Sequence, residues 1–193
     1  MGVQDSYDAV ADAYAAQFTD ELDHKPFDRD LLDRVAAEVA GPLVDIGCGP
    51  GHVGARAGAT VGLDLSHEML RIAPFPLCVR GDVRALPFAD GALGGAVAFY
   101  SLIHIPTLDS ALRELHRAIR SGGVLVVAVH EGEGEVTRDE WYGRAIDLWV
   151  RFWTRDEVVG ALTAAGFHIE SATTRESYEG ELFPRLYVVA IAA

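Results

Sequence analysis

A short apolar run, Leu43–Ile46, leads directly into a turn of glycines that spans residues 47–51. A run of this length, bounded by Gly41-Pro42 and by glycine, is typical of a buried strand. Glycines allow positive φ angles and lack a Cβ atom, so the backbone of such a turn can approach a ligand closely. Strand, glycine turn and helix in this order are typical of open α/β sheets, which bind ligands at the carboxyl ends of their strands.

The rest of the chain continues this alternation of strand and helix. Four further apolar runs predict strands: Thr60–Leu63, Leu77–Val79, Ala96–Tyr100 and Val124–His130. Helical spacing predicts helices between them over residues 52–57, 66–73 and 108–120. Strands that alternate with helices indicate a parallel sheet covered on both faces. Two final runs, 167–174 and 186–191, are joined without a helix and predict an antiparallel end. We therefore expect an α/β fold with a doubly wound, mostly parallel seven-stranded sheet, whose last strand is antiparallel.

Length and two irregular segments determine the predicted domain organisation. The 193 residues indicate a single domain, 1–193. Amphipathic helices over residues 5–19, capped by Asp5 or Ser6, and after Pro26 predict an N-terminal helical lid within residues 1–40. Residues 131–153 are rich in aromatics and do not fit the alternation. For this stretch we expect either a cap inserted over the substrate or a helix whose aromatic face packs on the core.

Composition and charge exclude several classes of protein. Half of the residues are hydrophobic and 23% are charged, which excludes global disorder. The net charge of −13 opposes contact with a phosphate backbone, so we expect no nucleic-acid partner. No apolar run reaches the length of a membrane span, and the two cysteines lack the spacing of a metal site. We therefore expect a cytoplasmic protein, a monomer or homodimer, with no membrane partner and no metal.

Two aspartates accompany the glycine turn. Asp45 lies at its mouth, and Asp64 ends the second predicted strand. A carboxylate has two acceptor oxygens, so Asp64 can bind both hydroxyls of a nucleoside ribose. The G-x-G-x-x-G spacing over residues 49–54 also matches a dinucleotide site, which would indicate an NAD(P)-binding oxidoreductase. Against that alternative, the charge of Asp45 would repel a pyrophosphate, and Pro50 has no N–H to donate to one.

Three motifs, in this order, resemble those of one enzyme family. They are VDIGCGPG at 44–51 with GLDLSHEML at 62–70, RGDVRALPF at 80–88, and LHRAIRSGG at 115–123. Together they resemble the small-molecule class I S-adenosylmethionine-dependent methyltransferases, over nearly the whole chain from about Tyr7. The resemblance implies a Rossmann-like fold, with S-adenosylmethionine as cofactor and S-adenosylhomocysteine as product.

The resemblance also implies a role for each matching position. Asp45 would lie against the amino group of the methionine portion, and Asp64 would bind the ribose hydroxyls. Other residues would contact the methionine end of the cofactor: Gly47, Cys48, Gly49, Tyr100 and Ser101. The adenine would lie among Leu65, Met69, Asp82 and Val83, with Asp82 accepting from its amino group. Tyr14 would close over the cofactor from the N-terminal helix.

The methyl acceptor needs alignment and, for some acceptors, a base that removes its proton. His104 and His130 follow the fourth and fifth predicted strands and are the candidate catalytic and acceptor-binding histidines, although a buried structural histidine is an alternative for each. Four aromatic residues are candidates for the acceptor pocket: Tyr7, Trp141, Tyr142 and Trp149. We expect methylation of a small molecule at oxygen, with carbon or nitrogen as alternatives. A protein of the same fold that binds the cofactor without transferring its methyl group is the remaining alternative.

Overall fold

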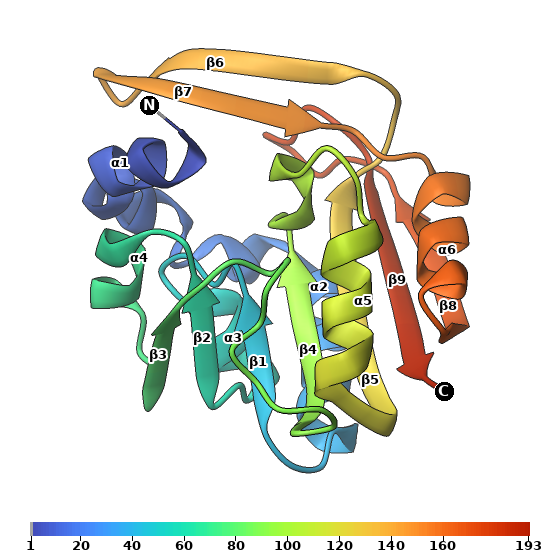
Figure 1. Ribbon diagram of the computed structural model, residues 1–193. Helices are drawn as coiled ribbons and strands as arrows, with labels where there is room; N and C mark the ends of the chain where they lie inside the picture. The colour runs from blue at the N-terminus through green and yellow to red at the C-terminus, as the bar shows by residue number, and fades with distance from the viewer. Residues whose placement is uncertain (1) are drawn as a thin grey trace.

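The main sheet carries the predicted order of strands. The computed structural model describes residues 2–193; Met1, the first residue of the predicted lid, lies outside the described residues. The strands of the main sheet are β1 (Leu43–Ile46), β2 (Val61–Asp64), β3 (Leu77–Arg80), β4 (Leu93–Phe99), β5 (Ile119–His130), β8 (Phe167–Arg175) and β9 (Arg185–Ala192). Within the described residues these seven strands follow the order β3-β2-β1-β4-β5-β9-β8 (Figure 1). Strands β1 to β5 pair in parallel, and β9 is antiparallel to both of its neighbours, which confirms the predicted fold.

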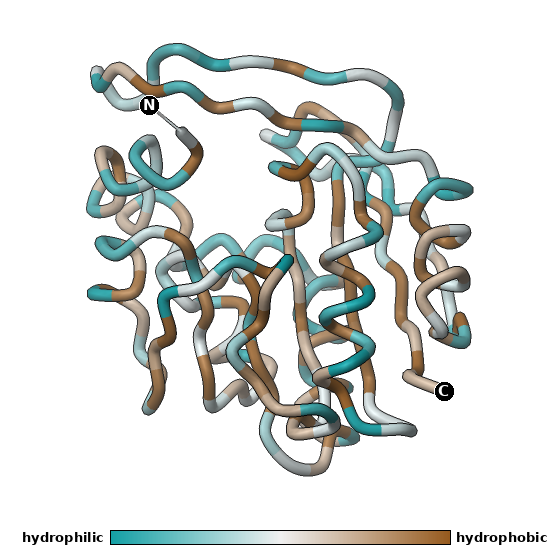
Figure 2. The backbone as a smooth tube through the Cα atoms, viewed as in Figure 1, coloured by the Kyte–Doolittle hydropathy of each residue, from teal (hydrophilic) through white to brown (hydrophobic). Residues whose placement is uncertain are grey.

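The central strands are buried because helices cover both faces of the sheet. Every residue of β1 and β4 is buried. On one face, α5 (Asp109–Ala118) and α6 (Arg155–Ala164) pack through Leu112, Leu115 and Leu162. On the other face, α2 (Pro26–Glu38) and α3 (His52–Ala57) pack through Leu32 and Val53. Figure 2 shows the apolar residues concentrated along these strands. With both faces covered, the carboxyl edge of the sheet is the part left for a ligand.

The first helix lies across that carboxyl edge, next to α4 (His67–Ile72) (Figure 1). This helix, α1, runs from Val3 to Phe18 and has Gly2 at its N-cap, so the predicted caps Asp5 and Ser6 are wrong. Ser6 is fully buried inside α1, where its hydroxyl donates to the Gly2 carbonyl and accepts from the Asp147 N–H. A serine at the start of an amphipathic pattern is a capping signal, but here it fastens the helix to a distant strand. A short 3₁₀ helix, Glu21–His24, connects α1 to α2.

The aromatic stretch forms a β-hairpin, so the predicted alternative of a docked helix is wrong. Its strands are β6 (Glu135–Trp141) and β7 (Arg144–Arg151), and they form a separate two-stranded sheet beyond the carboxyl edge (Figure 1). The two turn residues, Tyr142 and Gly143, have φ angles of 52° and 69°. Two positive φ angles in a two-residue turn match the twist of an antiparallel pair. Along β7, Ile146 and Leu148 are buried, so the burial has the period of a strand.

Two boundaries, the end of α5 and the start of α6, can be compared with the predicted ones. The predicted helix 108–120 ends at Ala118, and Ile119 instead begins β5 by pairing with Leu93. An apolar residue at helical spacing can equally continue into a buried strand, and here the sheet decides. At α6 the predicted capping box is confirmed, because Thr154 N–H donates to the Glu157 carboxylate at 2.9 Å and Thr154 Oγ1 accepts from Glu157 N–H.

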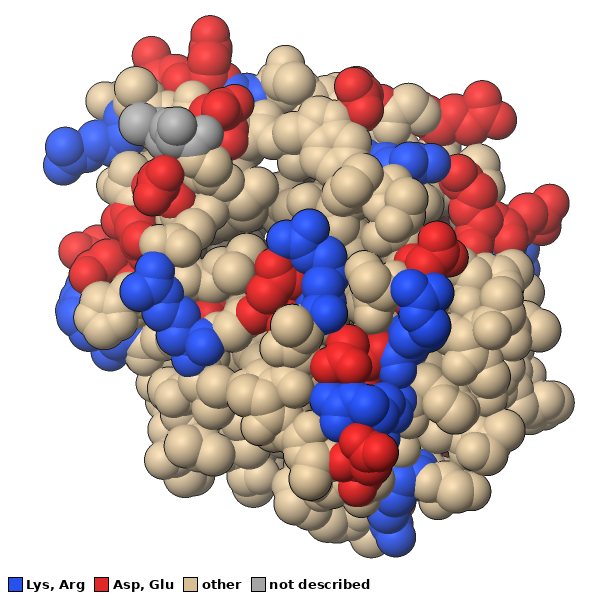
Figure 3. Space-filling model, viewed as in Figure 1, with Lys and Arg blue, Asp and Glu red and all other residues tan. Residues whose placement is uncertain are grey.

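Acidic and basic side chains are interspersed on the surface shown in Figure 3, which therefore presents charge of both signs. Several of these charges form exposed ion pairs, such as Arg117 with Asp90 and Arg71 with Asp12. No helix among residues 2–193 is both long enough and apolar enough to cross a bilayer.

Candidate functional site

A cavity of about 490 Å³ lies at the carboxyl edge of the sheet, beneath α1. This volume is in the range of small-molecule and cofactor sites. Every residue predicted to bind the cofactor lines it: Tyr14, Asp45, Gly47, Cys48, Gly49, Asp64, Leu65, Met69, Asp82, Val83, Tyr100 and Ser101. Tyr7 and His104 line it as well. The fold therefore brings residues from α1, the strand ends and the following loops around one space.

The glycine turn leaves room for a ligand only because its residues lack side chains. Gly47 has a φ of +65°, and a Cβ atom there would lie 2.3 Å from the Cβ atom of Ser101. The hydroxyl oxygen of Ser101 is buried and has no hydrogen-bond partner among residues 2–193. Gly47, after β1, and Ser101, after β4, therefore pack closely in the cavity wall, and the Ser101 hydroxyl is available to bind a ligand.

Two carboxylates accept from backbone N–H groups in and beside the glycine turn. Asp64 accepts from Gly49 N–H and Ser66 N–H, both at 2.8 Å. Asp45 accepts from Gly54 N–H at 2.9 Å. The N–H groups of Gly49 and Gly54 are among the donors that a dinucleotide site would offer to a pyrophosphate. Because carboxylates already occupy them, the turn presents negative charge to the cavity, and the dinucleotide alternative does not fit.

Burial raises the pKa of both carboxyl groups, so a nearby cation would favour their ionised forms. Burial of Asp45 raises its pKa to about 7; the Gly54 N–H partly offsets this, and the negative charge of Asp64 adds to it. Burial also raises the pKa of Asp64 above its usual range. A positively charged ligand group would stabilise the ionised form of either residue. An amino acid linked to a nucleoside, with its ammonium group near Asp45 and its ribose near Asp64, therefore fits these residues.

The side of the cavity predicted for adenine has a different character. Met69 is buried and Leu65 is about one-third exposed, so they provide an apolar surface at the end of β2. The Arg84 guanidinium donates to both oxygens of Asp82 and holds the pKa of that carboxyl below its usual range. Asp82 lines the cavity with its charge already paired, and its contact with an adenine amino group stays a prediction.

Tyr7 and His104 form a hydrogen-bonded pair in the wall of the cavity. The Tyr7 hydroxyl lies 2.8 Å from His104 Nε2, and His104 Nδ1 lies 2.8 Å from the carbonyl oxygen of Trp149. Tyr7 comes from α1, His104 from the 3₁₀ turn Leu102–His104 after β4, and Trp149 from β7. Three segments far apart in sequence therefore meet at this imidazole, and each of its ring nitrogens has a hydrogen-bond partner.

The comparison with protein families agrees with this arrangement. The family described as "Methyltransferase domain" matches residues 44–127, which contain the glycine turn, both aspartates and the strands β2 to β4. Over these residues the chain is similar to the S-adenosylmethionine-dependent methyltransferases, in agreement with the predicted family and cofactor.

Individual relatives of this chain are distant. A demethylmenaquinone methyltransferase of Desulfitobacterium hafniense is 30% identical over 144 residues, covering 64% of this chain and 56% of the relative. The chain spans about half the length of the curated relatives that it matches, between 52% and 56% for the first three. Two solved structures share the fold. A Thermotoga maritima methyltransferase, described as a possible histamine N-methyltransferase, is 19% identical, with a TM-score of 0.74 over 98% of this chain and 99% of that one. The DhpI–SAH complex is 22% identical, with a TM-score of 0.76 over 98% and 94%.

Four residues predicted to bind the acceptor lie behind the cavity wall. His130, Trp141, Tyr142 and Trp149 do not contribute to the lining of the cavity among the described residues. His130 stacks on the ring of Tyr100, with ring centroids 5.2 Å apart. Trp141 packs edge-on against Tyr7 and Tyr14, at 6.3 and 5.3 Å between ring centroids. The hairpin therefore supports the lining residues from outside the cavity. Trp149 does so through its backbone carbonyl, which contacts His104.

Sequence reasoning missed part of the cavity lining and a charged cluster beside it. The cluster consists of Glu21, Lys25, Asp28, His52, Arg175 and Glu181. Glu21 and His52 line the cavity and contact each other at 2.7 Å. Glu21 also pairs with Lys25, and that i, i+4 spacing was the one signal in the sequence.

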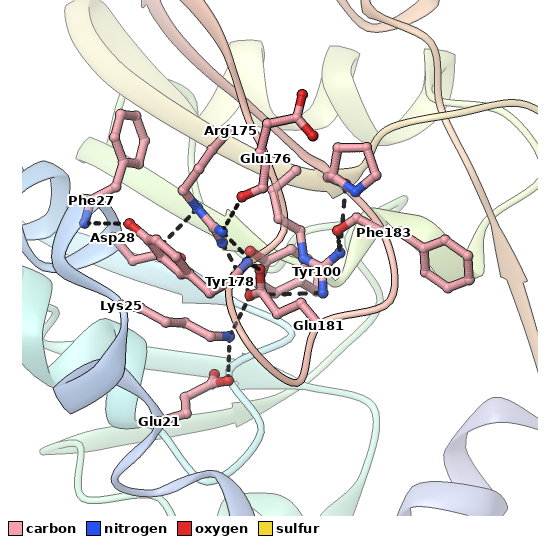
Figure 4. Close-up of polar contacts among 12 residues, drawn as sticks. Glu21, Lys25, Phe27, Asp28, Tyr100, Arg175, Glu176, Tyr178, Glu181 and Phe183 are labelled. Carbon is pink, nitrogen blue, oxygen red and sulfur yellow. Dashed lines mark hydrogen bonds and ion pairs between the residues drawn. The ribbon is translucent and has the colours of Figure 1, made fainter.

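Lys25 also pairs with Glu181 at 3.3 Å, so the cluster links the start of α2 to the β8–β9 loop (Figure 4). There, Arg175 pairs with Glu181 at 2.7 Å and donates to the Tyr187 hydroxyl, which donates in turn to Asp28. The Tyr187 hydroxyl also lies 3.0 Å from that of Tyr100, so the cluster supports the cavity wall.

Proposed function

We propose that this chain transfers the methyl group of S-adenosylmethionine to a small-molecule acceptor, by O-methylation. The bound cofactor supplies an electrophilic methyl group attached to a sulfonium. The chain holds the cofactor against the glycine turn and presents the acceptor on the side lined by Tyr7, Tyr100 and His104. Catalysis then depends mainly on alignment of the acceptor with that methyl group.

One observation carries the proposal: Asp64 accepts from Gly49 N–H in the glycine turn, Asp45 accepts from Gly54 N–H in the first turn of α3, and both carboxylates line the cavity. Such a site favours a cationic amino-acid nucleoside over a phosphate chain. The surface charge supports a small acceptor over nucleic acid, because the net charge is −13 and the face in Figure 3 mixes both signs.

The segments over the carboxyl edge fit a lid and a cap. We assign the lid role to residues 1–40 and the cap role to residues 131–153, as parts of a single methyltransferase domain 1–193. Support comes from α1 and the hairpin β6–β7, which pack on each other above the cavity (Figure 1). A cytoplasmic location and a monomeric or homodimeric state stay predictions.

Calorimetry with S-adenosylhomocysteine tests the cofactor site. We expect micromolar binding by the wild-type chain and a loss of about tenfold or more in Asp64→Asn, because the amide cannot accept from two hydroxyls while keeping both backbone bonds. The matched control is Asp33→Asn, which changes an exposed aspartate paired with Arg56 and should bind normally. Binding of NAD(P) in place of S-adenosylhomocysteine would contradict the proposal.

Turnover tests the second part of the proposal. Release of S-adenosylhomocysteine is measured with S-adenosylmethionine and a panel of phenols, alcohols and amines, and the product is identified by mass spectrometry. Methylation at oxygen is the expected result. Methylation at nitrogen or carbon alone would replace the O-methylation proposal. Cofactor binding with no turnover of any acceptor would indicate a non-catalytic binding protein.

A further inference from the structure

The hydrogen bonds of His104 fix the position of its proton. A carbonyl oxygen only accepts, so the bond of Nδ1 to the Trp149 carbonyl places the hydrogen on Nδ1. In a neutral imidazole Nε2 then has the lone pair and accepts from the Tyr7 hydroxyl. Both ring nitrogens of His104 are thus engaged, and neither is open to an acceptor molecule. The free lone pairs of the pair are on the Tyr7 oxygen.

We propose that Tyr7 and His104 act as one proton-accepting unit, in which the Tyr7 hydroxyl contacts the methyl acceptor and His104 receives the proton. This inference rests on the proposed function. Tyr7 is then a catalytic residue, and Trp149 positions His104 through its backbone carbonyl. The pair exists only when α1, the turn after β4 and the hairpin are packed together, since each contributes one member.

The environment keeps the pair neutral before reaction. Burial lowers the pKa of His104 and raises that of Tyr7, so a phenol and an uncharged imidazole are the stable forms near neutral pH. Asp64 and Arg138 act on Tyr7, Tyr14 packs against Tyr7, and His130 is coupled to His104. Burial also lowers the pKa of His130, to about 3, so this ring is uncharged as well.

The proposed step balances atoms and charge. As the acceptor heteroatom forms its bond to the methyl carbon, the electron pair of the broken C–S bond stays on sulfur. The acceptor heteroatom releases its proton to the Tyr7 oxygen, and the Tyr7 hydroxyl releases its own proton to His104 Nε2. The positive charge that was on the sulfonium is then on His104, where Nδ1–H still donates to the Trp149 carbonyl. Release of that proton to solvent restores the neutral pair.

The same geometry defines the class of acceptor. His104 receives a proton from the methyl acceptor through Tyr7, so the methylated atom of the acceptor must carry an O–H or N–H hydrogen. Five acidic residues line the cavity: Asp5, Glu21, Asp45, Asp64 and Asp82. The single arginine in that lining is Arg84, which is paired with Asp82. A carboxylate or phosphate acceptor would be repelled, so the acceptor is an alcohol, a phenol or an unprotonated amine without a negative charge.

The experiment compares wild type, Tyr7→Phe, His104→Gln and the double variant. Phenylalanine keeps the packing of Tyr7 against Tyr14 and Trp141. Glutamine keeps an oxygen that can accept from Tyr7 but cannot take up a proton. The control is Tyr178→Phe, which removes a phenol that accepts from Phe27 N–H outside the cavity. Each variant is measured for S-adenosylhomocysteine binding by calorimetry and for turnover of neutral phenols, anionic benzoates and primary amines.

We expect the S-adenosylhomocysteine affinity of every variant to lie within about threefold of wild type. In Tyr7→Phe and in His104→Gln, kcat should fall by about 10²-fold or more, whereas KM should change little. The double variant should be no slower than the slower single variant, because the two residues act as a unit. Wild-type kcat should fall on the acid side with a midpoint below pH 6.5, and His104→Gln should lose that limb. A merely structural role of His104 would leave the acid limb in place.

Several outcomes would overturn the inference. They are a kcat of Tyr7→Phe near that of wild type, losses in the two single variants that multiply in the double variant, an acid limb that survives in His104→Gln, and turnover of benzoates in preference to phenols and amines. A wild-type chain that binds S-adenosylhomocysteine but turns over no phenol or amine would equally contradict it. Absence of S-adenosylhomocysteine binding would instead refute the proposed function, so the two failures are distinguishable.

Discussion

Asp45 and Gly54 are in mutual contact at the floor of the cavity. The Gly54 N–H donates to Asp45 Oδ2 at 2.9 Å, and a Cβ atom at position 54 would lie 2.5 Å from that same oxygen. Glycine at position 54 therefore allows Asp45 to keep its hydrogen bond. Any side chain at 54 would push the carboxylate away from its only backbone donor among the described residues. The third glycine of the G-x-G-x-x-G spacing thus has a role in holding a carboxylate.

Gly54→Ala should destabilise the protein by about 1–3 kcal/mol, because the added methyl group overpacks against a carboxylate on a buried strand that cannot move aside. The matched control is Gly160→Ala in α6, where a Cβ atom would meet nothing within 4 Å and should stabilise the helix by about 1 kcal/mol. Urea unfolding of both variants measures the difference. Equal changes in the two variants would show that the contact with Asp45 is unimportant.

Asp45 should make the free energy of unfolding depend on pH. Its pKa in the folded protein is raised from 3.8 to about 7, so its contribution to stability is complete below pH 4 and is lost as the pH rises towards 7. Asp45→Asn removes that loss and should stabilise the protein, relative to wild type, by up to about 4 kcal/mol at pH 8. Urea unfolding at pH 4.5, 6 and 8 measures this, and a difference that does not change with pH would contradict it.

Ser6→Ala should loosen the lid while leaving the sheet intact. The Ser6 hydroxyl accepts from Asp147 N–H at 2.9 Å, and its removal leaves that donor without a partner, at a cost of about 1–3 kcal/mol. Hydrogen exchange of α1 amides should accelerate, whereas amides of β4 and β5 should keep their protection. Ser110→Ala, at a half-buried serine of α5, is the control and should leave α1 unchanged. Uniform acceleration across the sheet would indicate a global effect instead.

Arg175→Met should destabilise the protein by up to about 3–5 kcal/mol, because it removes the guanidinium that pairs with the buried carboxylates of Glu181 and Asp28. Glu181 keeps Lys25 at 3.3 Å, and Asp28 keeps the Tyr187 hydroxyl. The comparison is Arg34→Met, whose ion pair with Glu170 is 4.0 Å long and about half exposed, and which should cost less than about 1 kcal/mol. Thermal unfolding of the two variants side by side provides the measurement. Similar melting temperatures would mean that the cluster in Figure 4 contributes no more than a surface pair.

Local signals in the sequence predicted most of the fold and the cofactor side of the cavity. The apolar run into Gly47 and the acid at 64 determine strand ends by themselves, because period and turn chemistry are properties of neighbouring residues. The hairpin was missed because its turn, Tyr142-Gly143, lacks the usual Asn-Gly or Asp-Gly signal. Ser6 was misread as a cap because its partner, Asp147, is remote in sequence.

The sequence alone determined the order of strands and helices, the glycine turn and the carboxylates beside it, since each depends on residues close together in the chain. Only the tertiary structure decided that Tyr7 meets His104, that the Trp149 carbonyl fixes the imidazole proton, and that His130 lies outside the cavity. These relationships join α1, the end of β4 and the hairpin, and such contacts depend on how packed elements are placed in space. Hydrophobic periodicity carries no record of that placement.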